Sequence, residues 1–195
     1  REILGISVSL SEHEVHWRTF LESLKQRGLG GVQLITSDDH AGLRAARLAV
    51  FGGIPWQRCQ FHLQQNAQAY VPHKEMQTEV ADDIRTIFNA PDRVTADAYL
   101  AKTVLKYEKS ASRLSDWMAN NLPEGLMVFS FPGGFQRLLR TTNAVERLHR
   151  EVRRRARVVS IFPNKASCLR LVSAVLSEIS EEWLTGRTYI TFEND

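Results

Sequence analysis

The strongest constraint on the fold is a change of pattern near residue 70. Before this point, short segments rich in β-branched residues alternate with amphipathic helical segments. From residue 73 to residue 121, apolar residues instead recur at helical spacings of three and four. Alternating strands and helices are typical of a βαβ layer with a parallel sheet. The sequence therefore predicts an α/β core that is followed by an all-helical segment.

The α/β part is expected to contain three strands and two helices. The strands are predicted at residues 3–10, 32–36 and 56–63. Ser11 is the expected N-cap of the first helix, with Glu14 completing a capping box, and Gly28 ends that helix. The second helix is expected to end at Gly52. The apolar faces of these helices are expected to lie on the sheet.

The second half of the chain predicts helices separated by a loop. The apolar positions that define the helical segment are Met76, Val80, Ile84, Ile87, Leu100, Val104, Tyr107, Ala111, Leu114 and Met118. Pro123 and Gly133 punctuate the loop that follows. A further helix is expected to start at Asn143, and a last one carries apolar residues from 169 to 183.

Composition excludes several classes of protein. The 195 residues include Cys59 and Cys168 as the two cysteines, too few for a disulfide framework or a four-thiolate zinc site. No apolar run is long enough to span a bilayer, and the chain does not start with a signal peptide. The expected location is therefore the cytoplasm. A net charge of +3 is mild for a nucleic-acid binder, so the distribution of charge matters more than its sum.

Asp38 lies at the end of the second expected strand and in front of the second helix. This is the carboxyl edge of a sheet, where open α/β folds usually build their sites. Helix capping is the competing explanation, since an aspartate here can accept a hydrogen bond from the first turn. Asp39 and His40 extend the polar cluster, although turns commonly collect such residues.

Glu146 is surrounded by positive charge. Residues 137–157 include two acids, Glu146 and Glu151, and eight arginines: Arg137, Arg140, Arg147, Arg150, Arg153, Arg154, Arg155 and Arg157. Arginine clusters of this density usually neutralise phosphates, and a solvated basic face is the competing explanation. Glu146 can also complete a capping box with Asn143, three residues earlier.

Cys59 and His62 place a thiol and an imidazole at metal-like spacing, but they supply half of a tetrahedral zinc site. To complete it, His40, His149 or Cys168 would have to converge from distant parts of the sequence. The alternative is a buried cysteine beside a hydrogen-bonded histidine. A Cys–His nucleophilic dyad is disfavoured because no third, orienting group is evident.

Three segments closely resemble the motifs of bacterial mutator-type transposases in order and in spacing. They are residues 36–43 (TSDDHAGL), 56–62 (WQRCQFH) and 141–148 (TTNAVERL). The resemblance continues through residues 153–155 and 161–164 to Trp183, so it covers nearly the whole chain.

This resemblance implies a ribonuclease H-like α/β core that is interrupted by an all-helical insertion. The first part of the core would be residues 1–70, the insertion 71–124, and the second part of the core, with the glutamate-bearing helix, 125–195. In this family a DDE triad of two aspartates and one glutamate binds divalent metal. Asp38 matches the second aspartate and Glu146 the glutamate, whereas the first aspartate is expected upstream of this segment.

The resemblance also places the signature residues His40, Cys59 and His62 near the active site, without assigning a metal to Cys59 and His62. Two magnesium or manganese ions about 4 Å apart can activate an attacking oxygen and stabilise a leaving one during phosphoryl displacement. The implied reaction is DNA cleavage and strand transfer on transposon ends and target DNA, with the arginines on backbone phosphates. A homodimer at the bacterial nucleoid is implied for the complete protein.

Because the first aspartate is expected outside it, this segment alone is expected to be inactive. One alternative is a transposase-derived DNA-binding or scaffolding module that has lost catalysis. Another is a regulatory protein with structural zinc on Cys59 and His62, for which bound zinc would be the distinguishing observation.

Overall fold

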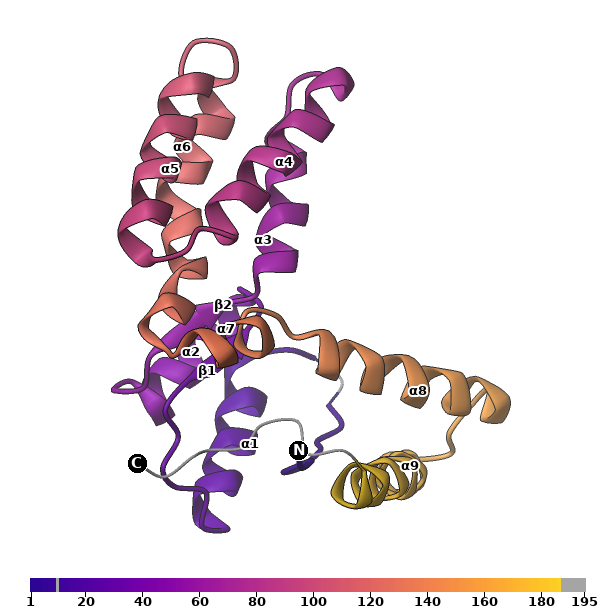
Figure 1. Ribbon diagram of the computed structural model, residues 1–195. Helices are drawn as coiled ribbons and strands as arrows, with labels where there is room; N and C mark the ends of the chain where they lie inside the picture. Colours follow the sequence, from indigo (N-terminus) through magenta and orange to yellow (C-terminus); the bar gives the residue numbers. More distant parts are fainter. Residues whose placement is uncertain (10, 187–195) are drawn as a thin grey trace. The chain divides into compact units, whose positions relative to one another are not determined.

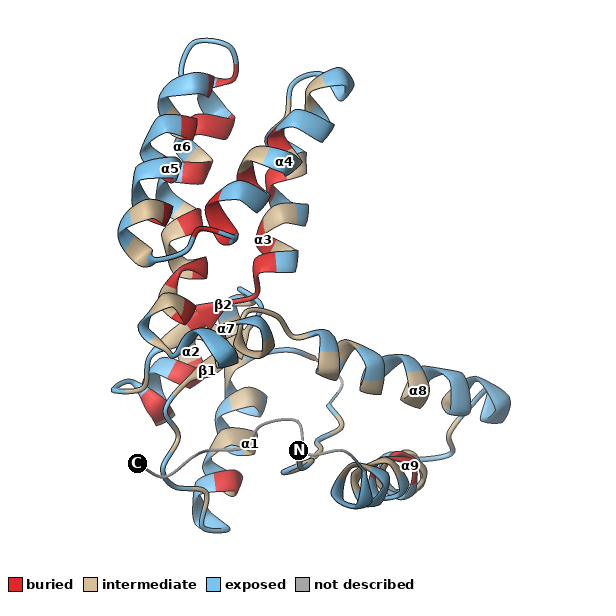
Figure 2. Cartoon of the chain, viewed as in Figure 1, coloured by how far each residue is buried: buried red, intermediate tan, exposed pale blue. Residues whose placement is uncertain are grey.

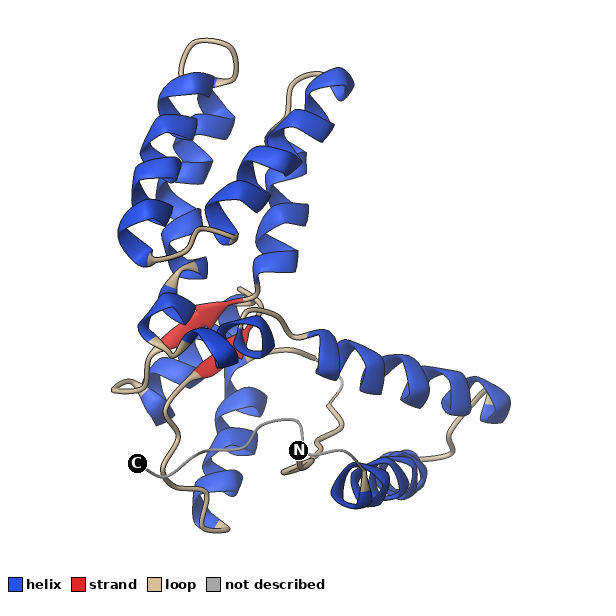
Figure 3. Cartoon of the chain, viewed as in Figure 1, coloured by secondary structure: helices blue, strands red, loops and turns tan. Residues whose placement is uncertain are grey.

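The computed structural model describes residues 1–9 and 11–186, which form parts of two compact units. The first unit comprises Arg1–Val32, His40–Gly53 and Asn143–Asp195, and the second comprises Gln33–Asp39 and Ile54–Thr142. Regular structure in the described residues is mostly helical, with one two-stranded parallel sheet (Figures 1 and 3). Within this described part, no helix combines the length and apolar character needed to cross a bilayer.

The sheet lies in the second unit and joins β1 (Ile35–Ser37) to β2 (Trp56–Arg58). The pairing is parallel, as the strand–helix alternation predicts, with Thr36 opposite Gln57. Backbone hydrogen bonds extend the ladder beyond both ends. Ile35 N donates to Pro55 O at 3.0 Å, and Cys59 N donates to Ser37 O at 2.9 Å.

Two of the three predicted strands need correction. Residues 3–9 form no strand, because no described segment supplies the backbone partner that a strand requires; Leu10, the last residue of that prediction, lies outside the described residues. The strand predicted at 56–63 ends at Arg58, and helix α3 (Gln60–Ala67) follows at once. Leu63 and Ala67, four residues apart, are fully buried on one helical face, so the apolar pattern there was helical.

The second unit is built mainly from helices after the sheet. They are α3, α4 (Gln77–Phe88), α5 (Arg93–Tyr107), α6 (Ser112–Asn121) and α7 (Gly133–Leu139), with 3₁₀ turns η1 (Gln68–Tyr70), η2 (Lys74–Met76), η3 (Leu122–Gly125) and η4 (Met127–Ser130). Figure 2 shows buried residues gathered on the inner faces of α3, α4, α5 and α6. The main hydrophobic cluster includes Leu63, Val80, Ile84, Ile87, Leu100, Tyr107, Leu114 and Met118. The helical segment predicted from the spacing of apolar residues is therefore confirmed.

Tyr107 is a polar member of this cluster. Its hydroxyl donates a hydrogen bond of 2.7 Å to Asp83 Oδ2. Burial, together with this bond to a carboxylate, raises the pKa of Tyr107 to about 12. The protonated phenol therefore stabilises the fold fully below the pKa of about 10 of an unfolded tyrosine. This contribution is lost as the pH rises through the folded pKa.

Replacing Tyr107 with phenylalanine is expected to lower the free energy of unfolding by about 1–2 kcal/mol at neutral pH, because Asp83 loses a donor. The variant should also lose the part of the alkaline destabilisation that this phenol causes above about pH 10. Urea unfolding at a series of pH values, followed by circular dichroism, measures both effects. Tyr99→Phe, at an exposed tyrosine, is the matched control. An equal pH dependence in Tyr107→Phe and the unmodified chain would contradict the assignment.

In the first unit, α1 (Glu14–Gln26) packs against α2 (Ala41–Phe51). The predicted capping box is wrong: His13, not Ser11, is the N-cap of α1, and it makes no side-chain cap. The C-terminal end is as expected. Gly28 has φ +97°, and Leu29 N donates to Leu24 O at 3.0 Å, which together close the helix.

Helices α8 (Asn143–Val159) and α9 (Lys165–Thr185) pack against each other in the same unit. Asn143 is the first residue of α8, and Glu146 lies in its first turn. Asn164 caps α9, with its side-chain oxygen accepting from Ser167 N at 2.9 Å. Both helices are thus found where the sequence predicts them.

Candidate active site

The two neighbouring aspartates after β1 have different partners within the second unit. Asp38 Oδ1 lies 2.5 Å from His62 Nδ1, and the Asp38 side chain remains half exposed. Asp39 Oδ2 lies 3.2 Å from Arg58 Nη1, and its side chain is 25% exposed. Of the two carboxylates, Asp38 is therefore the more accessible from solvent.

Arg58 holds Asp39 as part of a buried charge network. Its side chain is 5% exposed, and Nη1 also lies 3.0 Å from Glu124 Oε2 and donates to Asn121 Oδ1 at 2.9 Å. One guanidinium thus links the end of the sheet to the end of α6 and to η3. Two carboxylates and an amide oxygen lie at Nη1, so these short polar contacts offset part of the desolvation cost of burying the cation.

Helix capping does not account for Asp38. The N-cap of α2 is His40, and that position makes no side-chain cap. Asp38 instead joins Cys59 and His62 in a cluster whose potential ligand atoms all lie within 4.8 Å of one another. Within the second unit, Asp38 is the described residue that joins Cys59 and His62. The further ligands considered from the sequence, His40, His149 and Cys168, belong to the first unit.

Cys59 is fully buried at the N-cap of α3, and His62 lies in the first turn of the same helix. Thr142 donates to Cys59 Sγ twice, from its backbone N–H and from Oγ1, each at 3.4 Å. Leu63 N donates to Cys59 O at 3.0 Å and starts the helix. The turn from β2 into α3 therefore sets the positions of both signature side chains.

The segment from residue 139 to residue 142 is fastened beside this cluster. Thr36 Oγ1 donates to Leu139 O at 2.8 Å, and Gln60 N donates to Arg140 O at 3.0 Å. With the Thr142 bonds to sulfur, three hydrogen-bonded points hold the segment against β1 and the start of α3. None of these long-range contacts has a signal in the sequence, because they join residues about 80 to 100 positions apart.

Glu146 and His40 belong to the first unit. Glu146 is partly buried in the first turn of α8. His40 Nε2 lies 3.3 Å from Glu12 Oε2, so His40 has a partner in its own unit. Close packing also shapes this region, since a Cβ on Gly42 would meet Glu12 O at 2.4 Å. Gly42 thus allows the start of α2 to approach the chain that precedes α1.

The eight arginines of the basic segment divide between the two units. In the second unit, Arg137 is exposed, whereas Arg140 donates to Asn89 Oδ1 at 2.9 Å. Burial, and next the charge of Arg137, lower the pKa of Arg140. The remaining six arginines lie on α8 in the first unit, and all six are exposed: Arg147, Arg150, Arg153, Arg154, Arg155 and Arg157.

Five of these α8 residues, which we call the arginine stripe, share one side of the helix. They are Arg147, Arg150, Arg153, Arg154 and Arg157, at helical spacings of three and four. The partly buried Leu148 and Val152 lie on the other side of α8. Arg155 is separate from the stripe and lies 3.5 Å from Glu178 of α9. The stripe spans about 15 Å along the helix axis at about 1.5 Å per residue.

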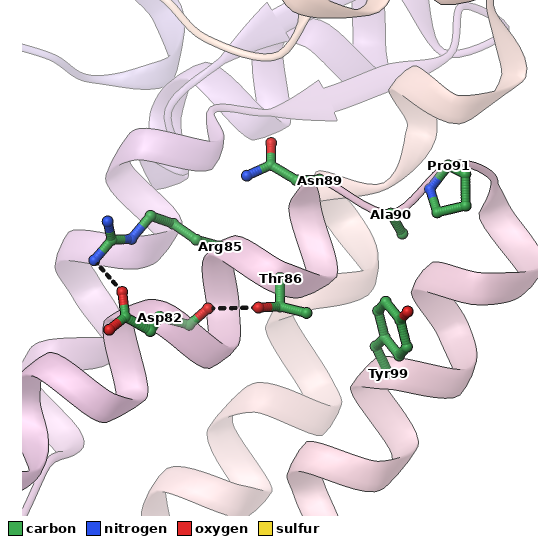
Figure 4. A pocket seen from close by; sticks show the side chains of 7 residues that line it. All are labelled: Asp82, Arg85, Thr86, Asn89, Ala90, Pro91 and Tyr99. Carbon is green, nitrogen blue, oxygen red and sulfur yellow. Dashed lines mark hydrogen bonds and ion pairs between the residues drawn. The ribbon is translucent and has the colours of Figure 1, made fainter.

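A pocket of about 610 Å³ lies elsewhere in the second unit, between α4 and the start of α5 (Figure 4). It is lined by Asp82, Arg85, Thr86, Asn89, Ala90, Pro91 and Tyr99. Asp82 pairs with Arg85 at 2.5 Å, and Thr86 donates to the Asp82 carbonyl, as the dashed lines in Figure 4 show. The pocket includes none of the candidate site residues, and Asn89 on its lining accepts a hydrogen bond from Arg140 at 2.9 Å.

A comparison with known protein families shows to which family the chain that carries these residues belongs. The model described as "Transposase, Mutator family" matches residues 1–186. The chain belongs to the Mutator family of transposases. The resemblance inferred from the three motifs is thereby confirmed, and this Mutator transposase segment carries Asp38, Cys59, His62 and Glu146 within the matched range.

Individual Mutator transposases show how much of such a protein the chain represents. It is 54% identical over 192 residues to the transposase of insertion sequence element IS406 from Burkholderia multivorans, covering 98% of this chain and 50% of that protein. It is 39% identical over 193 residues to the transposase of IS1081 from Mycobacterium tuberculosis, covering 99% and 46%. For the transposase of IS256 in transposon Tn4001 from Staphylococcus aureus, identity is 36% over 203 residues, covering 99% and 50%. The chain thus spans about half the length of these relatives.

Proposed function

We propose that this chain is part of the catalytic core of an insertion-sequence transposase that cleaves DNA and joins the freed strand to target DNA. The reaction is phosphoryl transfer with magnesium or manganese, and Asp38 and Glu146 are two of the metal ligands. Family membership supports the reaction class. The observation that carries the site assignment is the accessible Asp38 carboxylate at the end of a parallel strand, oriented by His62.

The residues around Asp38 fit a hard divalent cation in part. A half-exposed carboxylate supplies the oxygen donors that magnesium prefers. Asp39 is excluded from this role because Arg58 already holds it. The thiol and imidazole beside Asp38 are not magnesium ligands, and we assign them to positioning. The remaining carboxylate of the triad, its first aspartate, would come from the half of the family's sequence that this chain does not span.

Chain connectivity supports Glu146 as the second ligand. Thr142 is bonded to Cys59 in the cluster, and Glu146 follows four residues later. Four residues reach about 14 Å at most when fully extended, so the covalent chain alone keeps Glu146 in the neighbourhood of Thr142. We therefore propose Glu146 as the second ligand on its match to the family motif and on this short covalent connection.

Each residue then has a defined task. His62 holds Oδ1 of Asp38 and fixes the orientation of the carboxylate. Asp38 and Glu146 hold the ions, which when bound supply the positive charge that offsets charge building up on the phosphoryl oxygens. The arginine stripe binds backbone phosphates and keeps the DNA in register, without reading its sequence. Recognition of particular transposon ends is not a task of any residue named here.

We further propose that the fold is a ribonuclease H-like core. The parallel β1–β2 pair and residues 125–195 would belong to it, and 71–124 would be the helical insertion between its two parts. Two observations support this division. β1 and β2 are parallel with a helix between them in sequence, and α4, α5 and α6 bury their apolar residues mainly against one another and α3.

The experiment that tests the reaction is a hybrid protein. This chain would replace the matching half of the Burkholderia multivorans transposase, to which it is 54% identical. The hybrid is expected to cut and join DNA carrying that element's ends in magnesium or manganese. A hybrid that binds this DNA but never cuts it would favour the alternative function, a DNA-binding module without catalysis. If a homodimer of the hybrid acts on paired transposon ends, DNA cleavage would require two ends to be present in the same reaction.

The arginine stripe makes a separate prediction on the isolated chain. Arg150→Gln combined with Arg157→Gln is expected to weaken binding to duplex DNA of any sequence. Each lost phosphate contact should reduce the slope of log affinity against log salt by about 0.9, so the pair should reduce it by about 1.8. Filter binding or fluorescence anisotropy at several salt concentrations measures the slope.

Arg155→Gln is the matched control, because Arg155 lies off the stripe beside Glu178. Its effect on the salt slope should be negligible. The change in slope for each charge removed can then be compared between the two variants. If Arg155→Gln changed it as much as the double variant does, binding would depend on net charge and not on the stripe.

A further inference from the structure

We infer that Asp38, Cys59 and His62 form a binding site for a soft divalent cation of the zinc class, distinct in chemistry from a magnesium site. The three side chains come from two adjacent points of the second unit, the end of β1 and the start of α3. Their potential ligand atoms lie within 4.8 Å of one another. Among residues 1–9 and 11–186, these are the three histidine, cysteine or acidic side chains whose potential ligand atoms lie close enough together to hold one metal ion.

The distances suit a tetrahedral ion after small side-chain movements. With bonds of about 2.0–2.3 Å to nitrogen, oxygen and sulfur, tetrahedral ligand atoms stand about 3.3–3.8 Å apart. The spacing within 4.8 Å is slightly wider than this, and the 2.5 Å between Asp38 and His62 is narrower. An ion would therefore separate Asp38 from His62 and draw both toward the sulfur. Three protein ligands leave a fourth position for water.

The donor set selects against magnesium. Thiolate sulfur and imidazole nitrogen bind zinc and cobalt well, whereas magnesium requires oxygen donors in octahedral geometry. Cys59 Sγ is buried and receives two hydrogen bonds from Thr142, which complement a negative charge on sulfur. Such outer contacts orient metal ligands in proteins. Thr142 is thus placed to hold the sulfur in a ligating position.

The site has a consequence for catalysis that rests on the proposed function. Asp38 is a ligand in both assignments, so a soft cation held by Asp38, Cys59 and His62 removes this carboxylate from the magnesium site. Zinc is then an inhibitor that competes at one shared ligand. Cys59 and His62 make this site prefer a zinc-class ion to magnesium, because neither side chain is a magnesium ligand.

The test on the isolated chain uses cobalt, whose bond to a thiolate gives a charge-transfer absorption band in the near ultraviolet. We expect this band on titration with cobalt, and its loss when zinc displaces the cobalt. Cys59→Ser should abolish the band, and Cys168→Ser, at the second cysteine, should retain it. Asp38→Asn and His62→Gln should each weaken cobalt binding by about 10- to 100-fold or more, since even outer-sphere partners have effects of that size.

Circular dichroism of each variant shows whether it folds. If Cys59→Ser does not fold, His62→Gln gives the same test, because replacing an imidazole ligand shifts the visible cobalt bands. Absence of a thiolate band in the unmodified chain at millimolar cobalt would overturn the inference. So would a band that survives Cys59→Ser and disappears in Cys168→Ser.

The hybrid transposase separates this inference from the proposed function. Zinc is expected to inhibit its magnesium-dependent cleavage. The zinc concentration that halves the cleavage rate, with each protein compared with its own zinc-free rate, should be about tenfold or more higher for Cys59→Ser than for the unmodified hybrid. If cobalt binds through Cys59 but the hybrid never cleaves, the metal site stands and the proposed reaction fails. If the hybrid cleaves and no cobalt band forms, the reaction stands and the metal site fails.

Discussion

Asp38→Asn in the hybrid transposase is expected to lower the rate of DNA cleavage by about 1000-fold or more. Asparagine keeps the shape of the side chain and removes the negative charge that holds a divalent ion. Loss of several kcal/mol of charge stabilisation in the transition state corresponds to a factor of this size. Single-turnover cleavage of labelled end DNA measures the rate, with DNA binding measured in parallel.

The matched control for this variant is Asp116→Asn, an exposed aspartate of α6 in the same unit. It removes the same charge from a place without a proposed role and should leave the rate within about twofold. Because Asp38 is half exposed, Asp38→Asn should fold normally. Cleavage by Asp38→Asn at the rate of the unmodified hybrid would remove Asp38 from the metal site.

Arg58→Met is expected to lower the free energy of unfolding by about 3–5 kcal/mol. Removing one partner of a buried ion network leaves the others uncompensated, and here Asp39 and Glu124 would both lose their cation. Methionine approximates the length of the arginine stem, so little of the loss would arise from a cavity. Urea unfolding of the isolated chain, followed by circular dichroism, measures the difference.

Arg85→Met is the control in the same unit. Arg85 pairs with Asp82 three residues earlier on α4, and both side chains are more than half exposed. Surface pairs of this kind contribute about 0–1 kcal/mol, so the control should change stability little. Similar losses in Arg85→Met and Arg58→Met would mean that the buried network adds nothing beyond a surface ion pair.

Local patterns in the sequence were sufficient for most helices. The apolar spacing on α4, α5 and α6 predicted the elements and also the residues that they bury, such as Ile84 and Met118. This works because a helix brings residues three and four apart onto one face whatever surrounds it. The strand prediction at 56–63 was wrong beyond Arg58, since a short apolar run fits a buried strand and a buried helix equally well.

The candidate site could be predicted in its members but not in its contacts. Motif resemblance singled out Asp38, Cys59 and His62, yet nothing local indicated that Asp38 faces His62 while Asp39 faces Arg58. Successive residues at the end of a strand point in opposite directions, so neighbouring aspartates can have different partners that the local sequence does not reveal. Glu124 and Thr142 were missed for the same reason, because their roles depend on contacts far along the chain.

The Arg58 network also limits how the helical segment can be exchanged between proteins. Near the end of this segment, the Asn121 amide oxygen and the Glu124 carboxylate accept hydrogen bonds from Arg58, a cation that belongs to the sheet. A transplanted helical segment lacking these two acceptors would pack its own apolar residues correctly and still leave the buried Arg58 with one carboxylate partner, Asp39, in place of three acceptors. A graft would therefore have to extend through η3, or be accompanied by an uncharged residue at position 58.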